Sequence, residues 1–124
     1  MAGAEAVVRE FCAAVSQRDA SVLRPFFSDD VVYHNIPMDP AEGIEATMAT
    51  IDMFLGICEG LEFEVHHLAS DGETVLTERT DTFTIGGKTA PLPVMGIFQV
   101  HDGKITAWRD YFDMGQVNTI FGLS

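Results

Sequence analysis

The sequence of 124 residues is poor in cations, in cysteine and in long apolar runs. Seven Lys and Arg stand against 19 Asp and Glu, which gives a net charge of −12. Binding to phosphate backbones or to anionic lipid surfaces requires a basic patch, which this composition cannot supply. We therefore expect no nucleic-acid partner and no membrane partner, and the acidity itself favours solubility.

Two further shortages bear on where the protein works. No run approaches the 18 apolar residues of a membrane span, and no basic segment followed by an apolar one opens the chain. The only cysteines, Cys12 and Cys58, lie at apolar positions of predicted helices, so we interpret both as reduced core thiols. These features predict a cytoplasmic protein.

Apolar residues are plentiful. They make up 47% of the chain and include nine Phe, six Met and one Trp. This content is enough to build a core, and the length is that of one domain spanning residues 1–124.

In the first half of the chain, apolar residues recur every three or four positions, the spacing of a one-sided helix. This period predicts helices over residues 4–17 and 43–59, with a short helix after Asp19, which can serve as its N-cap. Residues 30–36 are β-branched and aromatic, and they predict a strand that ends at Pro37.

The second half alternates with a period of two and is predicted to hold strands alone. Three residue pairs that favour two-residue turns divide it, namely Asp71-Gly72, Gly86-Gly87 and Asp102-Gly103. The predicted strands lie near 61–69, 73–85, 88–100 and 104–113. An antiparallel meander covered on one face by the preceding helices makes an α+β cone, with a pocket between sheet and helices.

One face of the predicted strand at 73–85 carries charge among apolar residues. Alternation places Arg79 and Asp81 on a face shared with Val75, Thr77, Phe83 and Ile85. Burying both charges is costly unless they are paired and hydrogen-bonded. An Arg-x-Asp pair on a strand is also a common structural ion pair, so this pattern alone does not establish a site.

The last predicted strand also places a charge among apolar side chains. Asp110 shares a face with Thr106, Trp108 and Phe112, so two aromatic residues frame a carboxylate. The opposite face holds Ile105, Ala107, Arg109 and Tyr111. On the first strand, Tyr33 and Asn35 share a face and offer a phenol and an amide suited to holding water. A lone Asp is often solvated and Tyr-x-Asn before proline is often a turn. Taken together, the set fits a catalytic site and a structural arrangement equally well.

Two carboxylates and one arginine form a coupled titrating unit that can hold a single proton. One carboxyl group then acts as an acid and the other as a base at neutral pH. Opening an epoxide needs both, because the ring oxygen takes a proton while an activated water attacks a ring carbon. Ring strain supplies much of the driving force, so this chemistry requires neither a metal ion nor a covalent nucleophile.

At these residues the sequence resembles the limonene-1,2-epoxide hydrolase family, whose fold is the cone of NTF2-like and SnoaL-like proteins. The resemblance runs over about residues 5–115 and rests on four stretches: VYHNIP at 32–37, LTERTD at 76–81, GIF at 96–98 and GKITAWRDYFD at 103–113. It implies a curved, mostly antiparallel, six-stranded mixed sheet covered by three or four N-terminal helices, and a homodimer.

The resemblance also implies a role for each candidate residue. Asp110 is the general base, which takes a proton from a water that Tyr33 and Asn35 also hold. Asp81 is the general acid for the epoxide oxygen, and Arg79 bridges the two carboxylates. Attack and ring opening then occur in one step, without a cofactor and without a covalent enzyme ester, and the product is a vicinal diol.

Other residues are expected to line the pocket or to stay outside the site. The expected substrate-binding walls, apolar and suited to a small lipophilic epoxide, are Phe54, Phe83, Leu92, Val94 and Phe112; each is equally a plain core residue. The four histidines make no metal signature, since His66 and His67 are predicted to point to opposite faces of a strand. The chain is shorter than the best-known family member at both ends, so the substrate is expected to differ.

Two other functions fit the same fold. An epoxide-opening cyclase would use a substrate hydroxyl in place of water, although Tyr33 and Asn35 would crowd a bulky internal nucleophile. A non-catalytic carrier of lipophilic ligands needs only the apolar pocket, for which two buried acids and an arginine are an expensive arrangement. A proton shuttle of the ketosteroid-isomerase type is disfavoured, because Arg79 would hold a base carboxylate too acidic.

Overall fold

The helices of the first half begin and end close to the positions that the periodicity predicts. The computed structural model describes residues 3–122, in which the helices are α1 (Ala4–Ala14), α2 (Ala20–Leu23), α3 (Ile44–Ile57) and α4 (Met114–Phe121). Asp19 accepts a hydrogen bond from the Ser21 backbone N–H at 2.9 Å and is the predicted N-cap of α2. Within the described residues, no helix is long and apolar enough to cross a membrane.

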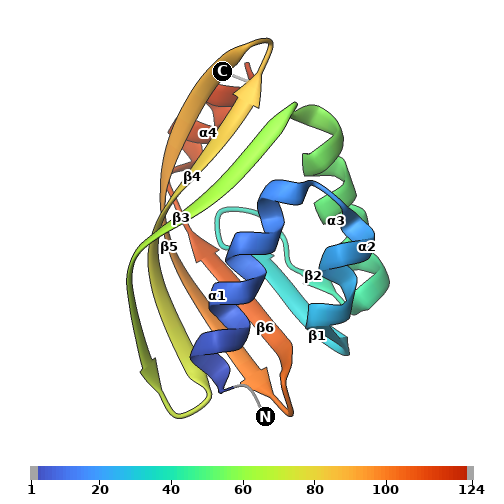
Figure 1. Ribbon diagram of the computed structural model, residues 1–124. Coiled ribbons are helices and arrows are strands. Elements are labelled where there is room, and N and C mark those ends of the chain that lie inside the picture. Colours follow the sequence, from blue (N-terminus) through green and yellow to red (C-terminus); the bar gives the residue numbers. More distant parts are fainter. Residues whose placement is uncertain (1–2, 123–124) are drawn as a thin grey trace.

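The strands form one mixed sheet. They are β1 (Phe27–Asn35), β2 (Ala41–Glu42), β3 (Gly60–Asp71), β4 (Thr74–Ile85), β5 (Lys88–His101) and β6 (Lys104–Tyr111), in the order β2-β1-β6-β5-β4-β3. β1 runs parallel to β6, and the other neighbouring pairs are antiparallel. Figure 1 shows the sheet curved around α1, α2 and α3, with α4 beside β4 and β5. The predicted α+β fold is confirmed.

Two of the three predicted turns have the expected backbone. Gly86-Gly87 and Asp102-Gly103 have positive φ at both central positions, as a two-residue hairpin turn requires. The first hairpin turns one residue later than predicted, at Gly72-Glu73, because Asp71 still pairs with Thr74.

A β-bulge in β3 overturns one predicted side-chain direction. The register with β4 shifts between Val65 and His67, so both His66 and His67 are exposed. His66 contacts Thr80 Oγ1 at 2.7 Å, and His67 contacts Glu78 Oε1 at 2.8 Å. The prediction that the two histidines point to opposite faces is therefore wrong, because a bulge adds a residue to one strand and breaks the alternation.

A second bulge affects β6. Its register with β5 shifts between Gln99 and Val100. Ile105 is consequently fully buried in the same core as Trp108, although strict alternation placed the two on opposite faces. From Trp108 onward the predicted faces hold, and Asp110 is buried while Tyr111 is exposed.

The prediction of strands alone in the second half is wrong at the C-terminal end. Asp113 accepts hydrogen bonds from the backbone N–H groups of Gly115 and Gln116 at 3.3 and 3.2 Å, and so caps α4. One of the described helices therefore follows the sheet, whereas all were expected to precede it. Val117 of α4 packs in a small cluster with Phe83, Leu92 and other residues of the sheet.

Trp108 lies at the centre of the main core, between the sheet and the helices. Its ring centroid lies 4.1–6.3 Å from those of five other aromatic residues, namely Phe11, Phe27, Tyr33, Phe63 and Phe98. The Tyr33 ring is stacked on it at 4.1 Å. Such packing fixes both rings and, with them, the neighbouring positions of β1 and β6.

Candidate active site

Arg79 is the centre of the candidate site. It lies on the inner face of β4, as alternation predicts, and only 1% of its surface is exposed. The guanidinium has five N–H donors, and each has an acceptor within 3.2 Å on Asp81, Asp110 or Thr77. Its carbon Cζ also lies 4.5 Å from the centroid of the Phe63 ring. The charge is thus buried with every donor satisfied.

Asp81 lies two residues further along the same face of β4. Arg79 Nε donates to its Oδ1 at 3.0 Å and Arg79 Nη2 donates to its Oδ2 at 2.8 Å, a two-bond fork. Its exposed fraction is 4%. Burial raises the pKa of Asp81 to about 6, against the lowering effect of Arg79, and the nearby Asp110 carboxylate adds to the rise.

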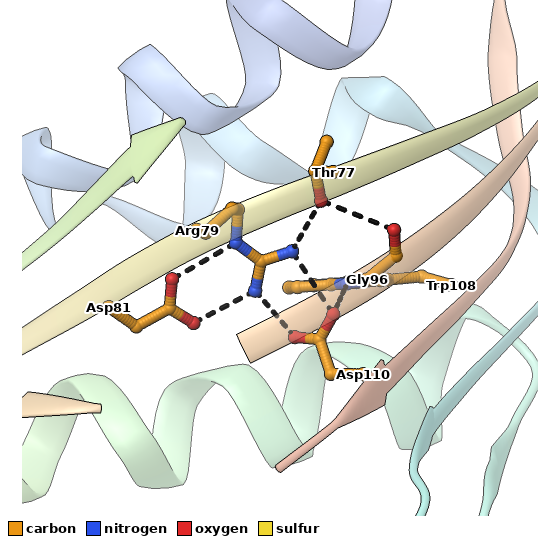
Figure 2. A network of polar contacts seen from close by, with 6 residues as sticks. All are labelled: Thr77, Arg79, Asp81, Gly96, Trp108 and Asp110. Carbon is orange, nitrogen blue, oxygen red and sulfur yellow. Dashed lines mark hydrogen bonds and ion pairs between the residues drawn. The ribbon is translucent and has the colours of Figure 1, made fainter. Parts of the chain in front are cut away.

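Asp110 reaches the same guanidinium from β6. Arg79 Nη1 donates to its Oδ1 at 3.1 Å and Nη2 donates to its Oδ2 at 2.8 Å. The indole Nε1–H of Trp108 donates to Oδ1 at 2.7 Å. Figure 2 shows the guanidinium lying between the two carboxylates, with Trp108 beside Asp110. Asp110 therefore has three N–H donors, and Arg79 joins the carboxylates of two different strands.

The two carboxylates also affect the pKa of Arg79. Burial alone would lower the pKa of Arg79, but Asp110 and Asp81 outweigh that effect, and the pKa is raised well above the usual value. The guanidinium is therefore a permanent cation. With both carboxylates ionised the buried unit would carry one net negative charge, which favours uptake of a single proton.

Tyr33 and Asn35 reach the site from β1. The parallel register pairs Tyr33 with Trp108 and Asn35 with Asp110, so the two polar side chains lie next to the carboxylate. The Ile36 backbone N–H donates to the Asp110 carbonyl at 2.9 Å and continues this pairing beyond Asn35. Burial raises the pKa of Tyr33, and Asp110 raises it further, so the phenol stays protonated.

A cavity lies between the sheet and the helices, with this polar group at its wall. Its empty space, counted together with the open solvent at its mouth, is about 670 Å³. The polar residues among its lining are Tyr33, Asn35, Asp81 and Asp110. The predicted apolar walls also line it: Phe54, Phe83, Leu92, Val94 and Phe112. Arg79 lies behind the two carboxylates that it holds.

Sequence reasoning missed several members of the site. Trp108 was expected only as an aromatic frame, yet its N–H is a donor to Asp110. Thr77 accepts a hydrogen bond from Arg79 Nη1 at 3.2 Å and donates to the Gly96 carbonyl at 3.2 Å. Val117 and Phe121 of the unpredicted α4 also line the cavity. The spacing of Met114, Val117, Ile120 and Phe121 after Asp113 was the signal available for that helix.

In the described residues, the side chains that could ligate a metal are scattered and both thiols are buried. Within residues 3–122, no three His, Cys, Asp or Glu side chains lie close enough together to hold a metal ion. Cys12 and Cys58 are free and buried, and burial raises the pKa of Cys12 to about 12. A thiol with that pKa stays protonated and is a poor nucleophile.

The curved sheet, its covering helices and the cavity between them define a class of protein. An NTF2-like protein of Burkholderia pseudomallei has the same fold, with a TM-score of 0.85 and 19% identity over 98% of each chain. The chain is thus an NTF2-like cone with two buried carboxylates at its cavity.

Closer likenesses show the family. The sequence model of the limonene-1,2-epoxide hydrolase catalytic domain matches residues 2–121. Epoxide hydrolase EphG of Mycobacterium tuberculosis is 37% identical over 107 residues, which are 86% of this chain and 71% of that protein. The structure of an M. tuberculosis LEH-like epoxide hydrolase has a TM-score of 0.82 and 35% identity, over 94% of this chain and 86% of the other. The chain belongs to the limonene-1,2-epoxide hydrolase family, and the predicted class of enzyme is confirmed.

Proposed function

We propose that this epoxide hydrolase adds water to a small lipophilic epoxide in one acid/base step and releases a vicinal diol. The observation that carries the proposal is the pair of buried carboxylates, Asp81 and Asp110, held by one arginine at the wall of an apolar cavity. Such a pair supplies an acid and a base a few ångströms apart, which is what concerted ring opening requires.

Asp81 is the proposed general acid. Its pKa of about 6 keeps part of the population protonated near neutral pH. The protonated carboxyl group lines the cavity and can donate to the epoxide oxygen as the carbon–oxygen bond breaks. Arg79 then stabilises the carboxylate that is left behind, because two of its N–H groups already donate to Asp81.

Asp110 is the proposed general base. A water held by Asp110, Tyr33 and Asn35 loses a proton to the carboxylate while its oxygen bonds to a ring carbon. The register that pairs Asn35 with Asp110 supports this placement of the water. The step leaves the proton on Asp110 and not on Asp81, so the proton returns to Asp81 through solvent before the next turnover.

The substrate is proposed to be a lipophilic epoxide without charged groups. Four polar residues near Arg79 line one part of the cavity. The other walls are apolar, with only weakly polar groups such as methionine sulfur, and they include Phe54, Phe83 and Phe112. An apolar ring or chain would occupy this space and leave the epoxide facing the two acids. Limonene oxide and cyclohexene oxide are suitable probes of this class.

The proposal is tested by hydrolysis of these probes in oxygen-18 water. We expect one label in the diol and none in any carboxylate of the enzyme after a single turnover. A labelled carboxylate would instead reveal a covalent ester and overturn the one-step mechanism. A product with an internal ether, from a substrate that carries a hydroxyl group, would favour the cyclase, and binding without turnover of any epoxide would favour the carrier.

Two conservative variants test the roles of the acids. Asp81→Asn and Asp110→Asn each keep the shape of the side chain but cannot transfer the proton, so each should abolish turnover while the fold is retained. Circular dichroism and thermal unfolding establish the fold of each variant. Wild-type turnover in either variant would remove that residue from the mechanism.

The assembly and the location of the protein stay predictions. We propose a homodimer, as the family resemblance implies, and light scattering after size-exclusion chromatography measures it directly. The cytoplasmic location predicted from the sequence is tested by cell fractionation.

A further inference from the structure

Gly96 lies at the point where the arginine crosses the sheet. The register aligns Thr77, Gly96 and Asp110 in one row across β4, β5 and β6. Neighbouring strands are about 4.8 Å apart, so Arg79 on β4 and Asp110 on β6 are separated by about 10 Å of sheet. The Arg79 side chain bridges this separation by lying over β5, and Figure 2 shows its guanidinium next to Gly96.

No side chain fits at position 96 beneath that guanidinium. A Cβ atom there would lie closer than 3.0 Å to both Arg79 Nη1 and Asp110 Oδ1, and 3.1 Å from Thr77 Oγ1. None of these atoms can move away from the added Cβ independently of the others. Nη1 donates to Asp110 and to Thr77, while Oδ1 also accepts from Trp108. All four side chains are buried, so a shift of one disrupts the contacts of the others.

The backbone does not explain the glycine. Gly96 is absent from the residues of positive φ, in contrast to the turn residues Gly72, Gly86 and Gly103, so an L-amino acid could adopt its conformation. Glycine inside a strand weakens the sheet and often marks a close approach of another group. Here that group is the guanidinium.

We infer that Gly96 is a positioning residue, whose missing side chain leaves the space through which Arg79 reaches Asp110 and joins the two acids into one unit. The inference rests on the proposed function of these acids. It assigns to Gly96 no contact with substrate, since this residue is not among those that line the cavity.

The test compares Gly96→Ala with a matched control, Gly56→Ala. Gly56 is exposed on α3, and a Cβ there would have nothing within 4 Å. The first readout does not depend on activity. Trp108 is the only tryptophan of the chain, so its indole N–H gives one signal in a proton–nitrogen NMR spectrum, and this N–H donates to Asp110 Oδ1. We expect the signal to move in Gly96→Ala and to stay in place in Gly56→Ala.

The second readout is steady-state kinetics with cyclohexene oxide. Displacing a catalytic group by about 1 Å can cost about 100-fold in rate, so kcat should fall by about that factor in Gly96→Ala. KM should change little, because the cavity walls are untouched. Wild-type kcat together with an unmoved indole signal would overturn the inference. If the wild-type enzyme opened no epoxide, the proposed function would fail, while the indole signal would still decide the role of Gly96.

A double-mutant cycle on the free energy of unfolding covers the case in which Gly96→Ala is too unstable for NMR and kinetics. Arg79→Met keeps an unbranched side chain but removes the guanidinium. Without the guanidinium, Asp110 loses two of its three N–H donors and can turn away from the added Cβ. Gly96→Ala should therefore destabilise the native protein strongly and the Arg79→Met protein much less. Equal destabilisation in both backgrounds would mean that position 96 requires glycine for another reason, and would overturn the inference.

Discussion

Raising the pH from 6 to 8 should slow epoxide hydrolysis by about 50-fold, because the proposed general acid, Asp81, must be protonated to give its proton to the epoxide oxygen. Burial raises the pKa of this carboxyl group to about 6 from its ordinary value of 3.8. A group with a pKa of about 6 is half protonated at pH 6 and about one part in a hundred protonated at pH 8. At its ordinary pKa it would be protonated in less than about one part in a hundred molecules even at pH 6. Burial is therefore the reason why a large fraction of Asp81 is protonated at pH 6.

The assay measures initial rates at saturating cyclohexene oxide between pH 6 and 9. The diol is quantified by chromatography. Parallel reactions without enzyme give the buffer-catalysed rate to be subtracted. A rate that is constant from pH 6 to 8, or that rises, would refute the assignment of Asp81 as an acid of raised pKa.

The same pKa predicts how stability depends on pH. Since the folded-state pKa of Asp81 is above the unfolded value, its contribution is fully present below about pH 4 and is lost as the pH rises through about 6. A shift of about two units corresponds to about 3 kcal/mol. The free energy of unfolding of the wild type relative to Asp81→Asn should therefore fall by about this amount between pH 4 and 7. Urea denaturation measures it, and an increase over this interval would contradict the raised pKa.

Two further variants probe the surroundings of the acids. Trp108→Phe retains an aromatic ring but removes the N–H that donates to Asp110 at 2.7 Å; hydrogen bonds to charged groups contribute about 2 kcal/mol, so urea denaturation should show a loss of that order, and turnover should fall. Unchanged stability and turnover would exclude a role for this hydrogen bond. Leu92→Phe adds volume at the cavity wall, so kcat/KM for limonene oxide should fall more than that for the smaller cyclohexene oxide. Equal effects on the two substrates would show that Leu92 does not limit the bound substrate.

Much of the candidate site could be predicted because strand alternation is a strong constraint. Arg79 and Asp81 are two residues apart, so they share a face in any regular strand, and burial of Val75 and Phe83 identifies that face as the inner one. Asp110 follows from the same rule on β6. What alternation cannot give is the register between strands, which decides that Asp110 and Asn35 are neighbours.

The errors occur where a local irregularity replaces the regular pattern. A bulge inserts one residue without any distinctive sequence, so the directions of His67 and Ile105 were predicted wrongly. The helix α4 is short, and a cap at Asp113 followed by eight residues is a weak signal beside a strong strand pattern. The role of Gly96 was equally hidden, because a glycine in a strand reveals its purpose only once the groups across the sheet are known.

The energetics of the buried group argue against a site retained for stability. Arg79, Asp81 and Asp110 are each at most 4% exposed, and removing such charges from water costs several kcal/mol per ion before their mutual attraction offsets it. Well-packed apolar residues of similar volume often serve a fold equally well or better. A carrier of apolar ligands could therefore dispense with all three, whereas an enzyme that must give a proton at one atom and take one at another cannot. Gly96, whose missing side chain leaves room for the arginine over β5, adds a further cost in stability to the same arrangement. The buried charges and the strand glycine all reduce stability, and all lie at one wall of an apolar cavity. This is the physical argument for acid/base catalysis there.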